Sequence, residues 1–118
     1  MAQPTIGDAI TLARKDLSDA VVPYRWTDPD FWLYGSHGQR EIMRQKPASQ
    51  YIGDDINTVD PDDVPDFTAS TDRLSISRKF LQALEHWLCY SVLKNDSEDA
   101  ANQKLAEYHW DKFLKEIG

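Results

Sequence analysis

The sequence has little cysteine, no long apolar run and fewer basic than acidic side chains, and each shortage excludes a class of protein. Cys89 is the only cysteine among 118 residues, so no internal disulfide and no zinc-binding cysteine cluster can form. One free thiol fits a reducing cytoplasm. No run of about 18 apolar residues occurs, so we expect no membrane-spanning helix. Residues 1–8 lack a basic region followed by an apolar one, so we expect no secretory signal.

The shortage of basic residues argues against binding to nucleic acid. The chain carries 13 Lys and Arg against 20 Asp and Glu, a net charge of −7, whereas binding to phosphate backbones needs clustered cations. DNA can still pass close by, because a negative wall keeps a phosphate backbone from adhering. With 41% hydrophobic residues the chain can form a small core, and we expect one domain over residues 1–118.

Catalytic motifs are also missing. His37, His86 and His109 are too far apart in sequence to share one helical face as pairs, and none lies in an HExxH motif. No nucleophile elbow and no phosphate-binding glycine loop is present. Cys89 lies in an apolar segment, where cysteine packs as a small hydrophobe. We therefore expect a protein that is not an enzyme, with no catalytic residue, no metal site and no cofactor.

What the sequence does contain is helical periodicity, which predicts an all-α bundle of about four helices. The expected helices cover residues 6–18, 29–46, 73–94 and 98–117. Thr5 and Asp8 form a variant of the capping box before the first helix, and the third helix, apolar over a wide face, should be central. Arg14 falls largely off the apolar face of the first helix. The side chains expected in the core are Trp26, Phe31, Ile42, Phe80, Leu84, Trp87 and Leu88.

A long acidic loop, residues 48–72, separates the two helical halves at 5–47 and 73–118. It contains seven aspartates, two prolines and no Lys or Arg, and it could hold a short β-hairpin. The run Asp60-Pro61-Asp62-Asp63 resembles part of a calcium loop, but Pro61 and the lack of a central glycine argue against calcium. A solvated or partner-facing loop is the better interpretation.

Two surfaces are candidates for assembly. Arg40 and Arg44 share a helical face that either forms local ion pairs or meets the acidic loop of a neighbouring copy. The apolar strip at the C-terminus either packs in the core or anchors a partner. The candidate interface residues are Arg40, Arg44, Asp54, Asp55, Asp60, Asp62, Asp63, Trp110, Phe113, Leu114 and Ile117.

Two glycines interrupt the second helix. Gly35 and Gly38 each cost about 1 kcal/mol relative to alanine in a helix interior. Their presence in a helix with a clear start at Thr27–Pro29 and a stop at Pro47 predicts the close approach of another backbone, from the same bundle or from a second copy.

The same segment carries a resemblance to a known family. Residues 24–28 (Tyr-Arg-Trp-Thr-Asp), Trp32-Leu33, residues 38–42 (Gly-Gln-Arg-Glu-Ile), Arg44 and Pro47 resemble the N-terminal signature of head-to-tail adaptor proteins of tailed bacteriophages. Residues 77–118 are similar to the C-terminal helices of that family. Relatives often have Asn-Asp before the glycine and a longer central segment, and this chain has neither.

The resemblance implies a structural virion protein located in the neck between capsid and tail and assembled in the bacterial cytoplasm. Such adaptors form a ring, typically a dodecamer, that binds the portal protein, extends the DNA channel and offers a docking surface to a tail, stopper or nozzle protein. The alternative from the residues alone is a small acidic helical module that sequesters a basic protein partner.

Overall fold

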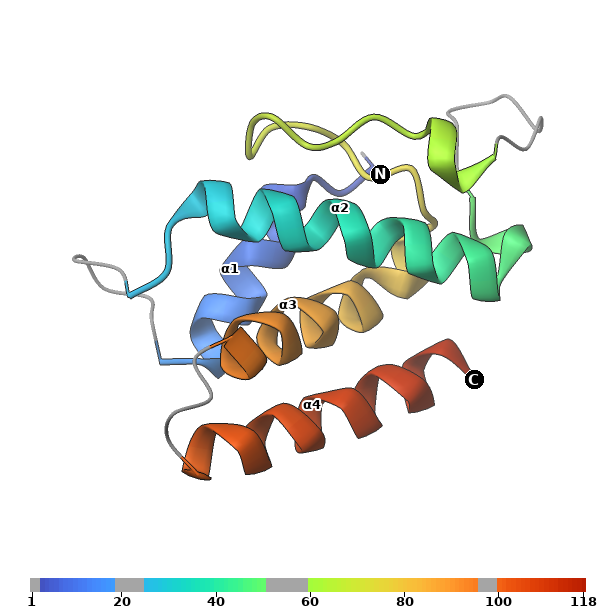
Figure 1. The fold of residues 1–118 in the computed structure, drawn as a ribbon. Helices are drawn as coiled ribbons and strands as arrows, with labels where there is room; N and C mark the ends of the chain where they lie inside the picture. The colour runs from blue at the N-terminus through green and yellow to red at the C-terminus, as the bar shows by residue number, and fades with distance from the viewer. Residues whose placement is uncertain (1–2, 19–24, 51–59, 96–99) are drawn as a thin grey trace.

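The computed structural model describes residues 3–18, 25–50, 60–95 and 100–118, and these contain four α-helices (Figure 1). They are α1 (Ile6–Asp16), α2 (Asp28–Gln45), α3 (Leu81–Asn95) and α4 (Ala100–Ile117), with short 3-10 turns η1 (Pro47–Ser49), η2 (Pro61–Asp63) and η3 (Arg78–Phe80). The predicted all-α bundle of about four helices is confirmed. In the described part of the chain, no helix is long and apolar enough to cross a membrane.

The central position of α3 is also confirmed. Figure 1 shows α3 between α2 and α4, and α1 packs against it as well. Its side chains Leu84, Leu88 and Cys89 are fully buried, since all three neighbouring helices cover them. Of the expected core residues, Phe31, Ile42 and Phe80 are buried too, whereas Trp26 and Trp87 pack against the core while remaining partly exposed.

The predicted start of the third helix at Arg73 is wrong. Helix α3 begins at Leu81, and the residues before η3 are extended. Arg73 and Ile76 form isolated antiparallel bridges with Thr5 and Gln50, and the Ser77 N–H donates to the Ser49 carbonyl at 2.7 Å. Ile76 is buried, as its apolar character predicts, but it lies in an extended segment that pairs with Gln50 and not in a helix. Of the acidic loop, where a short hairpin is expected, residues 60–72 form none, and residues 51–59 lie outside the described part of the chain.

The first two helices begin as their sequences predict. The Thr5 hydroxyl accepts from the Asp8 N–H at 3.2 Å and the Asp8 carboxylate accepts from the Thr5 N–H at 2.9 Å, which completes a capping box. Thr27 caps α2, with Pro29 in the first turn. Helix α2 ends at Gln45, because Pro47 disfavours helical geometry at the residue before it.

Arg14 lies inside the fold, although the sequence pattern places it off the apolar face. Its guanidinium donates to the Asp28 carboxylate at 2.6 Å and to the Trp26 carbonyl at 2.9 Å. The same group lies 4.9 Å from the centre of the Phe31 ring. Only 5% of Arg14 is exposed, so this arginine fixes α1 against the start of α2.

The two glycines of α2 make room for side chains of neighbouring helices. A Cβ on Gly38 would lie 2.4 Å from the Trp87 ring of α3, and one on Gly35 would lie 2.6 Å from the Ile6 side chain of α1. The Trp87 indole N–H then donates to the Tyr34 carbonyl at 2.9 Å. The neighbour at each glycine is therefore a side chain of the same chain, not the second backbone that the sequence suggests.

Gly38→Ala should destabilise the fold even though alanine is the better helix former. Overpacking against the Trp87 ring costs about 1–3 kcal/mol, whereas helix propensity alone would favour alanine by about 1 kcal/mol. The exposed neighbour His37→Ala is the matched control and should not lower stability. Urea unfolding of both variants measures the difference, and a stabilised Gly38→Ala protein would contradict the close contact.

Candidate functional site

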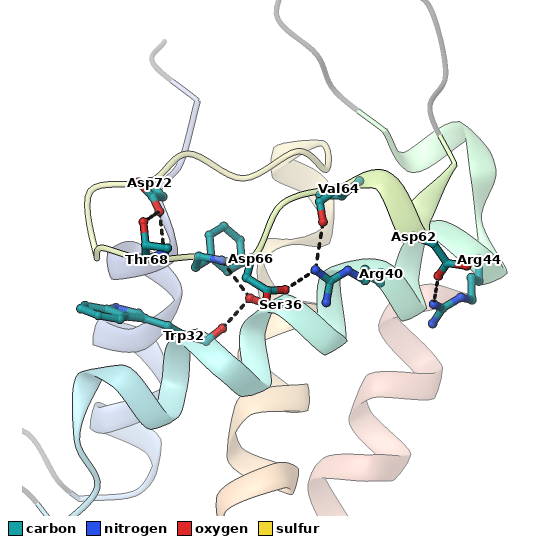
Figure 2. A network of polar contacts seen from close by, with 10 residues as sticks. Trp32, Ser36, Arg40, Arg44, Asp62, Val64, Asp66, Thr68 and Asp72 are labelled. Atoms are coloured by element: carbon teal, nitrogen blue, oxygen red, sulfur yellow. Dashed lines mark hydrogen bonds and ion pairs between the residues drawn. The ribbon is translucent and has the colours of Figure 1, made fainter.

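Four side chains of α2 hold the second half of the acidic loop against this helix. Trp32, Ser36, Arg40 and Arg44 are spaced four residues apart, so they form one row, here called the α2 polar row. Trp32 contacts Ser70, and Ser36 contacts Phe67. Arg40 contacts Asp66, and Arg44 contacts Asp62. The contacted positions descend along the chain, so residues 62–70 run antiparallel to α2 (Figure 2).

The first half of the α2 polar row is partly buried. The Trp32 indole donates to the Ser70 hydroxyl at 3.0 Å. The Ser36 hydroxyl donates to the Trp32 carbonyl at 2.7 Å and accepts from the buried Phe67 N–H at 2.9 Å. Gln39, beside the row, accepts from the Ser75 N–H at 2.7 Å. These contacts satisfy backbone groups that an irregular buried segment would otherwise leave unpaired.

The second half of the α2 polar row is ionic. Arg40 donates to the Val64 carbonyl at 2.9 Å and pairs with Asp66, and Figure 2 shows its guanidinium between them. Arg44 pairs with Asp62 at 2.6 Å. The Arg40 side chain is 17% exposed, whereas that of Arg44 is 49% exposed. Both predicted arginines thus contact acidic residues of their own chain, and a contact with a neighbouring copy stays a prediction.

Two of the other acidic candidates are on the surface, and two lie outside the described residues. Asp60 is exposed and accepts from the Asp62 N–H at 3.0 Å, which begins η2. Asp63 is exposed as well. Asp54 and Asp55 lie outside the described residues, so their predicted role is not addressed by the structure.

The C-terminal strip is divided between core and surface. Phe113 is fully buried with its ring 5.2 Å from that of Trp87, and Ile117 is 8% exposed. Trp110 is partly buried and stacks near Tyr90, with ring centres 5.0 Å apart. Leu114 is 44% exposed. Of the four predicted residues, only Leu114 and part of Trp110 are accessible to a partner.

Beside the accessible part of Trp110 lies an open groove between α3 and α4. Its volume is about 500 Å³, and Tyr90, Lys94, Ala106 and Trp110 contribute to its lining. The lining combines two aromatic rings with polar side chains of both charges, among them Lys94, Glu107 and Asp111.

A cluster of titratable side chains, which the sequence does not reveal, forms where α1, α3 and α4 meet. The His86 and His109 Nδ1 atoms are 3.0 Å apart, and a Glu85 carboxyl oxygen lies 3.3 Å from the His86 Nδ1. Asp16 lies within 4.8 Å of both imidazoles. The histidines are 23 residues apart and on different helices, so no spacing rule within one helix could have found the pair.

Burial keeps most of this cluster uncharged. It raises the pKa of Glu85 to about 8, and the hydrogen bond to Asp16 acts in the same direction. Burial lowers the pKa of His86 and of His109, and each histidine is thus disfavoured as a cation. Burial also raises the pKa of the Cys89 thiol, which donates towards the Glu85 carboxyl at 3.5 Å. A fully buried neutral thiol is a poor nucleophile.

Comparison with protein-family models, with curated proteins and with solved structures found no match to this chain. A functional proposal therefore depends on the residues of the chain and on their geometry.

Truncation of the two arginines of the α2 polar row should have unequal effects. Arg40→Ala leaves the Val64 carbonyl without its donor and should cost about 1–3 kcal/mol. Arg44→Ala removes a solvent-exposed ion pair and should leave the free energy of unfolding almost unchanged. Chemical denaturation measures both. Equal losses would show that charge alone, and not the buried carbonyl, determines the contribution.

Glu85→Gln should stabilise the protein increasingly as the pH rises. The pKa of Glu85 is raised from 4.5 to about 8 in the folded state, so between these values the folded chain retains a proton that the unfolded chain has released. The free energy of unfolding therefore falls with rising pH in this window. The Glu85→Gln variant has no carboxyl group to titrate at this position, so its free energy of unfolding does not show this fall. Each pKa unit corresponds to about 1.4 kcal/mol, so the gain at pH 8 should reach a few kcal/mol.

The matched control for this measurement is Glu107→Gln, at an exposed position of α4. Its stability relative to the unmodified protein should not follow the same pH window. A Glu85→Gln difference that stays constant between pH 4.5 and 8 would contradict the neutral state of the buried carboxyl.

Proposed function

We propose that this chain is a subunit of the head-to-tail adaptor ring of a tailed bacteriophage. In this role, copies of the chain bind the portal vertex as a ring, typically a dodecamer, extend the DNA channel and provide a docking surface for the tail. The single observation that carries the proposal is the resemblance of residues 24–47, which include the cap and the whole of α2.

Several residues of the resembling segment hold α2 against other parts of the chain, and this supports the proposal. Gly38 accommodates the Trp87 ring, Gln39 accepts from the Ser75 N–H, and Arg40 binds the Val64 carbonyl. Ile42 is fully buried. These members of the motif fix α2 to other segments, so the architecture of the subunit explains them without any catalytic step.

The exposed side of α4 is the surface that we propose for docking to the portal or to the tail. Leu114 is 44% exposed, and Trp110 lines the groove between α3 and α4. Tryptophan is enriched among the residues that contribute most to binding at protein interfaces, and the exposed Leu114 one turn away extends the apolar surface beside it. The remaining members of the C-terminal strip, Phe113 and Ile117, hold α4 to the bundle and set the position of those anchors.

The charge of the subunit suits a channel. A ring of chains with net charge −7 repels a phosphate backbone, so DNA can pass without adhering. The alternative, an acidic module for a basic partner, would need its aspartates to be accessible. Asp62 and Asp66 are exposed but pair with Arg44 and Arg40, which offsets part of the negative charge that residues 60–68 could offer to a basic partner.

Portal capture tests the proposal. The purified chain is mixed with the portal protein encoded in the same genome, and complexes are analysed by size-exclusion chromatography and negative-stain imaging. We expect a ring of this chain stacked on the portal ring. Absence of a complex, together with salt-sensitive binding to a basic protein, would favour the acidic-module alternative.

Leu114→Asp and Leu105→Asp form a matched pair for locating the interface. Both positions are on α4 and are exposed to a similar degree, 44% and 48%, but only Leu114 belongs to the C-terminal strip. Leu114→Asp should weaken portal binding at least about tenfold, because a charge replaces an apolar anchor. Leu105→Asp should bind as the unmodified chain does. Equal binding by both variants would remove the C-terminal strip from the interface.

A further inference from the structure

We propose that His86, His109 and Asp16 form a binding site for a divalent transition-metal ion of the zinc class. The three side chains come from α3, α4 and the last residue of α1, respectively. Their ligand atoms all lie within 4.8 Å of one another. The site is independent of the proposed role in a phage neck, and neither proposal requires the other.

The distances between the ligand atoms suit a metal ion. Zinc binds histidine nitrogen and carboxylate oxygen at about 2.0–2.2 Å, so neighbouring ligands of a tetrahedral ion are about 3.3 Å apart. The two Nδ1 atoms are 3.0 Å apart, which is close to that separation. Asp16 is exposed at the end of α1, so its carboxylate can move the remaining distance without displacing the core.

The ligand types select the class of ion. Two imidazole nitrogens with one carboxylate suit zinc and similar divalent ions, whereas calcium and magnesium prefer ligand sets made only of oxygen. Glu85 stays outside the set: its carboxyl oxygen lies 3.3 Å from the His86 Nδ1, but burial raises its pKa to about 8 and keeps it protonated. Cys89 stays outside the set, since its thiol is directed to the Ala13 carbonyl at 3.8 Å and to Glu85 at 3.5 Å.

The charges around the cluster favour a cation. The carboxylates of Asp16 and Glu116 favour positive charge at His86, and Lys112 is the opposing positive group. A bound ion would offset this excess of carboxyl groups. It would also join α4 to α1, and α4 otherwise packs mainly against α3 (Figure 1).

A proton is the competing occupant of the site. Two neutral imidazoles whose Nδ1 atoms are 3.0 Å apart can form one N–H···N hydrogen bond, in which one ring donates and the other accepts. A metal ion would replace this proton and would take a lone pair from both rings. The experiment must therefore separate metal binding from an internal hydrogen bond.

Zinc titration of the tag-free, metal-stripped chain makes that separation. In competition with a chromophoric chelator, the unmodified chain should bind one Zn²⁺ per molecule. His86→Gln and His109→Gln should each lose at least about tenfold in affinity, since even substitutions beside a metal's ligands commonly cost that much. The matched control is His37→Gln, an exposed histidine of α2, which should bind as the unmodified chain does. Zinc should raise the melting temperature only where the site is intact.

A second measurement keeps the test decisive if a buried histidine variant fails to fold. Nitrogen NMR of the unmodified chain should show that zinc shifts the Nδ1 signals of His86 and His109 and leaves those of His37 unchanged. Asp16→Asn, at an exposed position, should weaken binding without unfolding the chain. Failure of the unmodified chain to bind zinc stoichiometrically, equal binding by folded histidine variants, or unchanged Nδ1 signals would each overturn the site and leave the shared proton as its occupant.

Discussion

The contact between Trp87 and Gly38 determines how the helices of this protein come together. The indole ring occupies the space that a side chain on Gly38 would take, and its N–H binds the Tyr34 carbonyl of the same helix. The ring also belongs to an aromatic group with Tyr90, Trp110 and Phe113. One side chain of α3 thus positions both α2 and α4, and the approach of α2 is possible only because glycine has no Cβ.

Once α2 is fixed in this way, its opposite side determines the path of the chain between the two helical halves. The α2 polar row binds residues 62–70 at four successive helical turns, so the segment follows the helix over most of its length. The contacts change from partly buried at Trp32 to exposed at Arg44. This arrangement presents the described part of the acidic segment at a defined place, beside a helix whose other face packs in the core.

Much of the fold follows from the sequence, because helix periodicity and capping are local properties. The capping box at Thr5, the start of α2 at Thr27 and the central place of α3 all belong to this class. The start of α3 is not predictable in the same way, because residues 73–77 pair with two distant segments, the start of the chain at Thr5 and the end of α2 at Ser49 and Gln50. The burial of Arg14 was hidden because its partner, Asp28, lies on another helix.

The same limit applies to the candidate sites. Arg40 and Arg44 were recognisable as a pair, but their partners depend on the path of residues 62–66. Trp110, Phe113, Leu114 and Ile117 follow one apolar pattern, and only the packing of α4 separates the exposed members from the buried ones. His86 and His109 meet through tertiary packing alone.

The pairing of the chain's first residues with residues 70–76 has a consequence for biosynthesis. Gln3 donates to the carbonyls of Leu74 and Ile76, and the N–H groups of Ile6 and Gly7 donate to residues 72 and 70. Leu74 and Ile76 follow Gln3 by 71 and 73 positions in the sequence. At common rates of translation they are therefore synthesised roughly 4–15 s after Gln3. During that interval the nascent first helix has neither its backbone partners nor α3 to pack on. Residues 3–7 are therefore synthesised well before their final contacts can form.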